Sequence, residues 1–161
     1  MLVLGIDPGL ETTGYGLVEE AAGRLRALDY GVIKTRRTES LAERLLTLHA
    51  AISRLISERS PEAVAMEELF FRRNVTSAIG VGQARGVLLL AVAQRGLPFE
   101  EYTPSQVKQA VTGYGRADKE QIGRVLQLLL GLEAIPRPDD AGDALGVAIC
   151  HLNHRRLGAF G

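Results

Sequence analysis

The sequence predicts one α/β domain built on a mixed β-sheet with helices on both faces. The first third of the chain holds short apolar runs separated by turns, which is typical of consecutive antiparallel strands. After residue 40, helical patterns alternate with two short strand-like runs, which favours parallel strands with helices packed on both sides. With 161 residues the chain has the length of one domain. We expect it to cover residues 1–157, followed by a short tail over 158–161.

The first three predicted strands lie close together in the sequence. Residues 2–7 form an apolar run that stops at Asp7, where a Pro-Gly turn begins. Residues 12–18 alternate with glycines, and residues 25–34 form the third run. Because the connections are short, we expect these strands to form an antiparallel meander.

The rest of the chain predicts helices and two further strands. Apolar residues recur at helical spacing after Ser40, which forms a capping-box pattern with Glu43. A buried strand over 63–66 then leads into Glu67. The remaining predicted elements are a helix over 75–94, a strand over 99–102, and helices over 104–111, 119–130 and 139–154.

Charge and cysteine content limit the class of protein. Basic and acidic residues are equal in number, 19 each, which argues against a polycation that coats nucleic acid. Residues 71–125 carry eight basic and four acidic groups, an arrangement that suits phosphates held beside carboxylates, or an ordinary mixed surface. Cys150 is the single cysteine, and we expect an inert, buried thiol in a reducing compartment. The longest apolar run, residues 87–93, is short for a membrane span, so we expect a cytoplasmic protein without a membrane partner.

Four acidic residues stand out as candidate metal ligands. Asp7 ends the first strand and Glu67 ends the fourth, and these strands can be neighbours in a mixed sheet. Asp140 and Asp143 lie three apart at the start of the last helix, so both project from one face. Carboxylates gathered at one edge would repel one another unless divalent cations neutralise them, and oxygen ligands alone favour Mg²⁺ or Mn²⁺. Taken singly, each acid also fits a turn, a helix cap or a solvated strand end.

Several ordered segments resemble the bacterial RuvC family of Holliday-junction resolvases, the crossover junction endodeoxyribonucleases. The resemblance is collinear and covers nearly the whole chain. The segments that carry it are GIDPG (5–9), TGYG (13–16), MEELF (66–70), GQARG (82–86), QVKQ (106–109) and DAGDAL (140–145).

The resemblance implies a ribonuclease-H-like fold with three antiparallel and two parallel strands. It also implies a Mg²⁺-dependent endonuclease that resolves four-way DNA junctions by paired symmetric nicks in recombination and repair. The family's partners would be a second copy of the chain and a branch-migration helicase complex. The four acids above would be catalytic and would bind two Mg²⁺ ions, with Mn²⁺ as the alternative, while Lys108 and Lys119 would lie near the scissile phosphate.

Aromatic and basic residues follow the fourth strand. The resemblance implies that Phe70 contacts the junction, and Phe71 next to Arg72 and Arg73 suits stacking on DNA bases. One of the two rings would instead belong to the core. For Lys108 and Lys119, the ordinary alternative is that both are solvated surface lysines without a role in the site.

The helix over 75–94 is the predicted dimer surface. We expect it to present a stripe of mostly small residues to a partner helix and to pack other apolar residues on the sheet, although burial within one subunit fits nearly as well. The stripe assigned to the partner is Ala78, Gly82, Arg85, Leu89 and Val92. The residues assigned to the sheet are Ile79, Val87, Leu88 and Leu90.

Three other functions compete with this interpretation. A nucleotide binder of the actin or sugar-kinase type also begins with a strand and an Asp-x-Gly turn, but it needs two such lobes. A junction-binding module without catalysis would not need the full acidic set. A ribonuclease H that acts on RNA–DNA hybrids would need it, and a comparison of substrates separates the two enzymes.

Overall fold

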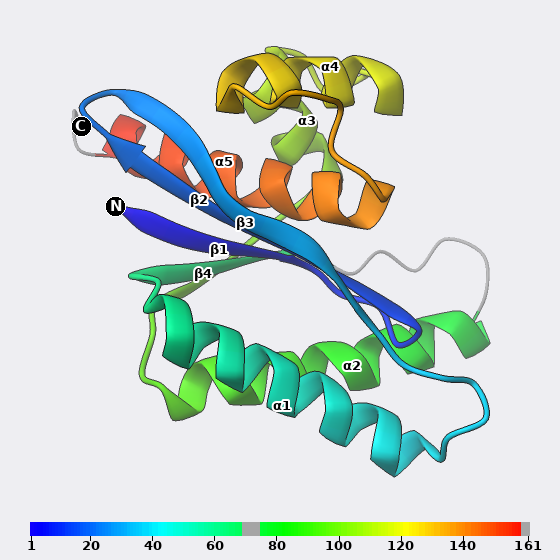
Figure 1. The fold of residues 1–161 in the computed structure, drawn as a ribbon. Helices are drawn as coiled ribbons and strands as arrows, with labels where there is room; N and C mark the ends of the chain where they lie inside the picture. Colours follow the sequence, from blue (N-terminus) through cyan, green and yellow to red (C-terminus); the bar gives the residue numbers. More distant parts are fainter. Residues whose placement is uncertain (69–74, 159–161) are drawn as a thin grey trace.

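The computed structural model describes residues 1–68 and 75–158 and contains a five-stranded mixed sheet. The strands lie in the order β3-β2-β1-β4-β5 (Figure 1). The first three are antiparallel, whereas β4 runs parallel to β1 and β5 runs parallel to β4. The predicted sheet of three antiparallel and two parallel strands is therefore confirmed. The strands are β1 (Leu2–Asp7), β2 (Thr12–Ala21), β3 (Arg24–Lys34), β4 (Ala63–Glu67) and β5 (Phe99–Tyr102).

Helices cover both faces of the sheet, as expected (Figure 1). One face carries α1 and α2, and the other carries α5 with α3 and α4 stacked outside it. Ser40 caps α1, and the predicted capping box with Glu43 is present. The helices are α1 (Leu41–Arg59), α2 (Val75–Gln94), α3 (Pro104–Thr112), α4 (Lys119–Leu130) and α5 (Asp139–Gly158). The last helix is longer than the predicted 139–154.

The alternation of side chains along the strands produces two separate cores. Leu4 and Ile6 of β1 point to the face covered by α1 and α2, and both are fully buried. Val3 points to the opposite face and packs with residues of α5 such as Val147. Asp7 follows the same alternation as Val3, so it belongs to the face that α5 covers.

The orientation of α2 differs from the prediction. Val92 is buried instead of facing a partner, whereas Ile79 and Leu90, which were assigned to the sheet, are about half exposed. Arg85 pairs with Glu101 of β5 in the same chain. The helix is apolar around its whole circumference, so its periodicity did not show which side faces the sheet.

Among the described residues, α2 is the one helix long and apolar enough to cross a membrane, judged by length and composition alone. Only 22% of its apolar window is buried within the subunit.

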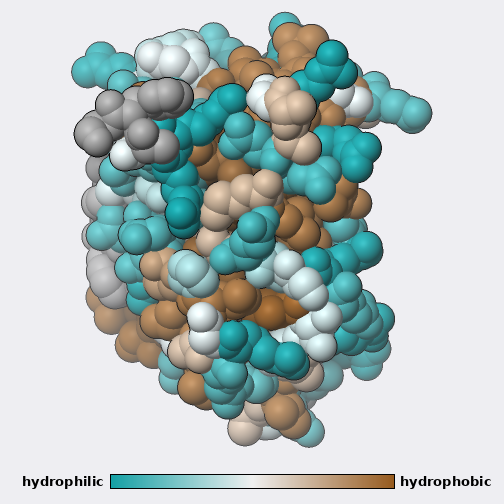
Figure 2. All heavy atoms as spheres, turned by 90° about the vertical axis from the view of Figure 1, so that its left-hand side faces the viewer, coloured by the Kyte–Doolittle hydropathy of each residue, from teal (hydrophilic) through white to brown (hydrophobic). Residues whose placement is uncertain are grey.

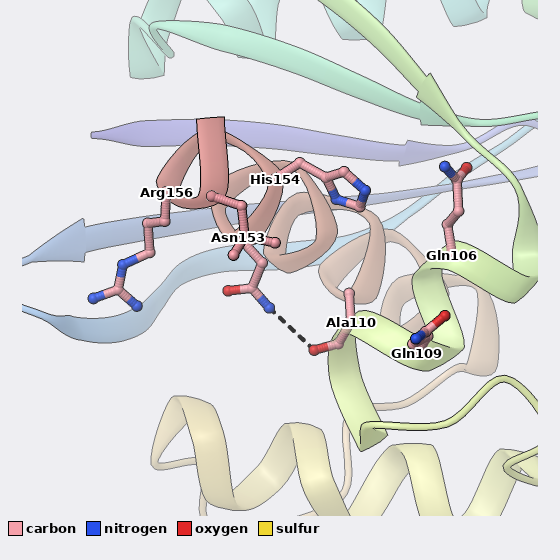
Figure 3. A pocket seen from close by; sticks show the side chains of 7 residues that line it. Gln106, Gln109, Ala110, Asn153, His154 and Arg156 are labelled. Carbon is pink, nitrogen blue, oxygen red and sulfur yellow. Dashed lines mark hydrogen bonds between the residues drawn. The ribbon is translucent and has the colours of Figure 1, made fainter. Parts of the chain in front are cut away.

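The two largest grooves of the described surface lie away from the predicted site residues. One, of about 1160 Å³, runs between the β2–β3 hairpin and the C-terminal end of α4. The other lies between α3 and α5, where the Asn153 side chain donates a hydrogen bond to the Ala110 carbonyl (3.0 Å; Figure 3). Figure 2 shows the side of the molecule that lies at the left in Figure 1, and on it apolar side chains lie in recesses between polar ones. Lys119 and Asp143, two of the predicted site residues, line a third and much smaller pocket.

Candidate metal centre

Two of the four acids meet because β1 and β4 are neighbours. The parallel register pairs Ile6 with Met66, and the next residues along the two strands are Asp7 and Glu67. Their side chains lie on the same face of the sheet, and the charge of Glu67 acts on Asp7. The sequence expectation that the ends of the first and fourth strands share one edge agrees with this geometry.

The N-terminal turn of α5 brings the other two acids to this edge. One carboxylate oxygen each from Asp7, Asp140 and Asp143 lies within 4.8 Å of the other two. All three residues are half-buried. The charge of Asp143 also acts on Glu67, so the four carboxylates form one electrostatic group. We call them the acidic cluster.

Glycines in β1 and β2 allow α5 to approach the sheet this closely. A Cβ on Gly14 would lie 1.9 Å from the Asp140 carbonyl oxygen, and one on Gly5 would lie 2.0 Å from that of Ala144. Glycine inside a strand often marks such a close approach of two backbones. The glycines therefore set the distance between the sheet, which carries Asp7, and the helix, which carries Asp140.

Burial and mutual repulsion favour protonation of the cluster when no metal is bound. Burial, followed by the charges of Glu67 and Asp143, raises the pKa of Asp7 to about 9. Burial is also the main cause that raises the pKa values of Glu67 and Asp143. The Asp7 carboxyl, which holds a proton at neutral pH, would release it to a cation.

This set of donors fits a hard divalent cation. All the ligating atoms are carboxylate oxygens, which Mg²⁺, Ca²⁺ and Mn²⁺ prefer, and the cluster includes neither Cys nor His, which Zn²⁺ prefers. The raised pKa values indicate that the positive charges nearby do not fully offset the cost of burying these carboxylates together.

The two predicted lysines lie on the helices that flank the cluster. Lys119 is the first residue of α4, and its Nζ is 3.7 Å from Asp139 Oδ2 and 3.8 Å from Asp143 Oδ2. Lys108 of α3 is close enough for its charge to lower the pKa values of Glu67 and Asp143, against the larger effect of burial. The sequence interpretation did not include Asp139, which pairs with both Lys119 and Arg137.

The four candidate DNA contacts lie outside the described residues. They are Phe70, Phe71, Arg72 and Arg73. His151, to which the sequence assigns no role, lies within α5. His151 is buried, and its Nδ1 lies 3.0 Å from the Tyr102 hydroxyl. No local signal in the sequence indicates this contact, because it depends on the pairing of β4 with β5.

The comparison with protein families identifies the chain. Residues 3–151 match the family model described as "Crossover junction endodeoxyribonuclease RuvC". The chain belongs to this family. The RuvC protein of Desulfitobacterium hafniense is 59% identical over 157 residues, covering 98% of this chain and 95% of the relative. The RuvC protein of Moorella thermoacetica is also 59% identical, over 151 residues and 94% and 90% of the two chains.

A solved structure of the RuvC family has nearly the same fold. Thermus thermophilus RuvC, solved in complex with a Holliday-junction substrate, superimposes with a TM-score of 0.93 at 41% identity. The match covers 98% of this chain and 96% of the T. thermophilus chain. The ribonuclease-H-like architecture implied by the sequence is thus confirmed for the whole domain.

The protonated cluster predicts an unusual dependence of stability on pH. Between the unfolded pKa of Asp7, 3.8, and its folded pKa, about 9, the folded state holds a proton that the unfolded state has released. Stability of the metal-free protein should therefore fall as pH rises through this window. We expect the melting temperature to drop by at least about 3 °C between pH 5.5 and 8.5. For a domain of this size, such a drop corresponds to a loss of about 1 kcal/mol in the free energy of unfolding. Thermal melts with a metal chelator measure it.

His151 requires a control in this experiment, because burial lowers its pKa and makes stability rise with pH just below 6.5. His151 contributes equally to the melting temperature of the Asp7→Asn variant. The difference in melting temperature between wild type and variant therefore isolates the contribution of Asp7 in the acidic cluster. A difference that stays constant or grows more favourable to wild type with pH would contradict the prediction.

Proposed function

We propose that this protein is an endonuclease that resolves four-way DNA junctions by paired symmetric nicks, in recombination and repair. The observation that carries the proposal is the acidic cluster, which four carboxylates form where β1, β4 and the start of α5 meet, in a domain that matches RuvC proteins almost end to end.

Two Mg²⁺ ions per site, with Mn²⁺ as the alternative, are the proposed cofactors. Asp7 would hold them together with Glu67, Asp140 and Asp143, because its carboxylate lies among the other three. Such a pair of ions supplies an activated water and stabilises the leaving oxygen of the scissile phosphodiester. The chain's own contribution is to fix the four carboxylates in place before the substrate arrives.

Lys108 and Lys119 are proposed to act on the substrate phosphate. Both approach the cluster from α3 and α4, and the exposed amine of Lys119 lies at its rim. A cation there would balance the charge that builds up on the phosphate during cleavage.

The Lys119→Ala variant separates this role from general DNA affinity. Turnover should fall on the order of 100-fold, as for other groups that stabilise charge mainly in the transition state. Junction affinity without divalent metal should change little, because one exposed lysine is a small part of a polyanion interface. Single-turnover cleavage and a binding titration measure the two. Equal losses in both would make Lys119 an ordinary phosphate contact.

Further DNA and protein contacts are proposed from the sequence and the family. Phe70 and Phe71 would stack on bases where the junction is distorted, and Arg72 and Arg73 would neutralise nearby phosphates. A branch-migration helicase complex is the proposed protein partner, and the bacterial cytoplasm is the proposed location.

A homodimer joined through α2 is the proposed assembly. Two symmetric nicks call for two identical sites related by a closed two-fold axis. The exposed side of α2 forms an almost uncharged stripe at helical spacing, and only 22% of the apolar window of the helix is fully buried in its own subunit. A Cβ on Gly86, in the middle of the stripe, would meet nothing within 4 Å. The stripe consists of Val75, Ile79, Gln83, Gly86, Leu90 and Ala93.

The Gly86→Glu variant tests this interface. A charge buried at the centre of an apolar contact should yield a folded monomer, which sedimentation detects. The monomer should still bind metal but should lose paired cuts, so that nicked junctions accumulate. Gly158→Glu introduces the same charge at the end of α5, away from the stripe, and should remain dimeric. A wild type that sediments as a monomer and still makes paired cuts would rule out the dimer.

Mapping of the nicks on a mobile four-way junction tests the function itself. With Mg²⁺ or Mn²⁺, we expect cuts at symmetric positions on two opposed strands. An RNA–DNA hybrid should resist cleavage, which separates the proposal from a ribonuclease H, and absence of ATP hydrolysis would exclude the nucleotide binder. Junction binding without cleavage under any metal would leave only the non-catalytic module.

A further inference from the structure

A buried polar contact joins β5 to α5 behind the acidic cluster. Tyr102 pairs with Glu67 in the β4–β5 register, so its side chain lies on the same face of the sheet as that ligand. Its hydroxyl lies 3.0 Å from Nδ1 of His151. The tyrosine is 7% exposed and the histidine 2% exposed. We call this contact the Tyr102–His151 bond.

The histidine sits on the helix that carries the other ligands. His151 follows Asp140 by about three helical turns and lies on the same face of α5. The Tyr102–His151 bond thus links the neighbour of Glu67 in the sheet to the helix of Asp140. A shift of α5 along its axis would move Asp140 relative to Glu67 and would break this bond.

Apolar packing holds α5 against the sheet, and a small number of polar contacts add direction to it. The sheet surface below the first half of α5 includes Gly5, Gly14 and Gly16, which the helix backbone and the Leu145 side chain approach closely. Near the other end of α5, Arg156 pairs with Glu20 of β2 at 2.9 Å, and this ion pair is partly exposed. Asn153 ties α5 to α3, not to a strand (Figure 3). In the part of the chain that the structure describes, the Tyr102–His151 bond is the only buried hydrogen bond between a side chain of α5 and the sheet.

The bond is not an obvious means of gaining stability. Burial raises the pKa of Tyr102 to about 12, and burial and then Arg155 lower the pKa of His151, so both groups are neutral near pH 7. Whichever nitrogen carries the ring proton, Nε2 of His151 is buried without a partner. Two apolar side chains of similar shape would avoid that cost and could stabilise the fold as well. What they could not supply is a directional contact that fixes one position of the helix.

We propose that Tyr102 and His151 are positioning residues, whose hydrogen bond fixes α5 along the sheet and thereby sets the spacing between Glu67 and the two aspartates of the cluster. The proposal deepens the proposed function and rests on it for the cleavage measurement alone. Binding of Mn²⁺ to the DNA-free protein tests it independently of any substrate.

The test compares Tyr102→Phe with a double variant, Tyr102→Phe/His151→Leu. Tyr102→Phe should be less stable than wild type and should bind Mn²⁺ about ten-fold more weakly, the effect typical of removing a group that orients a metal ligand. The double variant should recover the stability, because no buried ring nitrogen remains unpaired, but it should still bind Mn²⁺ weakly. Electron paramagnetic resonance of free Mn²⁺ gives the affinity, and urea unfolding gives the stability.

Tyr15→Phe is the matched control. Tyr15 lies in β2, its side chain lies near Asp29, and it packs with the core on the opposite face of the sheet. The Tyr15→Phe variant loses a tyrosine hydroxyl, as Tyr102→Phe does, and should bind Mn²⁺ as tightly as the wild type. If Tyr102→Phe binds Mn²⁺ as tightly as Tyr15→Phe, or if the double variant recovers affinity together with stability, the bond is merely structural. A wild type that binds Mn²⁺ and cuts no junction would refute the proposed function and leave this comparison intact.

Discussion

Replacement of Asp7 by Asn should abolish junction cleavage while it stabilises the metal-free protein. Asp7 lies among the other three carboxylates, and its pKa near 9 shows that a negative charge at this position is unfavourable without a cation. An amide keeps the shape, removes one repelling charge and weakens the binding of divalent cations. We expect cleavage to fall by about three orders of magnitude or more, the upper end of losses from removing one transition-state contact. Single-turnover assays and urea unfolding at pH 8 measure the two effects.

Asp29→Asn provides a matched control in the same sheet. Asp29 pairs with Arg59 at 2.8 Å, so its charge is favourable where that of Asp7 is not. The same change should therefore lower stability, by about 1 kcal/mol or less for a partly exposed pair, and leave cleavage unchanged. Cleavage by Asp7→Asn at a rate near that of wild type would show that the reaction occurs elsewhere on the protein.

The acidic cluster could be predicted from the sequence because each of its members ends or begins an element. A strand that stops at Asp7 and another that stops at Glu67 place their side chains at the sheet edge wherever the two strands are neighbours. The spacing of Asp140 and Asp143 on a helix then requires that both face the same way. The periods of strands and helices give the direction of each side chain, whereas the pairing of β1 with β4 had to be assumed.

The packing of α2 and the Tyr102–His151 bond needed the coordinates. Apolar residues occupy every side of α2, so the sequence contained no signal for which side packs on α1 and the sheet. His151 and Tyr102 are 49 residues apart in the chain, and only the parallel pairing of β4 with β5 brings them together. Contacts of this kind depend on which strands are neighbours, which local periodicity does not determine.

Glycines inside the predicted strands β1 and β2 indicate that another backbone comes close to the sheet there. The sequence does not show which backbone it is. Gly14 shows what depends on them. In the Gly14→Ala variant, the added methyl group would lie 1.9 Å from the carbonyl oxygen and 2.4 Å from the carbonyl carbon of Asp140. Because it meets backbone rather than the end of a flexible side chain, α5 must move away from the sheet. Overpacking of this kind costs about 1–3 kcal/mol, and we expect a loss at the upper end of that range.

The same movement should weaken metal binding, because Asp140 is displaced from Asp7 while the ligands themselves are unchanged. We expect Mn²⁺ to bind about 10- to 100-fold more weakly, as when the support of a metal ligand is removed. Gly158→Ala is the control, since its added Cβ at the far end of α5 meets nothing within 4 Å. Urea unfolding and Mn²⁺ titration of both variants separate the site-specific effect from that of an added methyl group. A Gly14→Ala protein within about 0.5 kcal/mol of wild type in stability, with unchanged Mn²⁺ affinity, would show that the sheet–helix distance does not control the cluster.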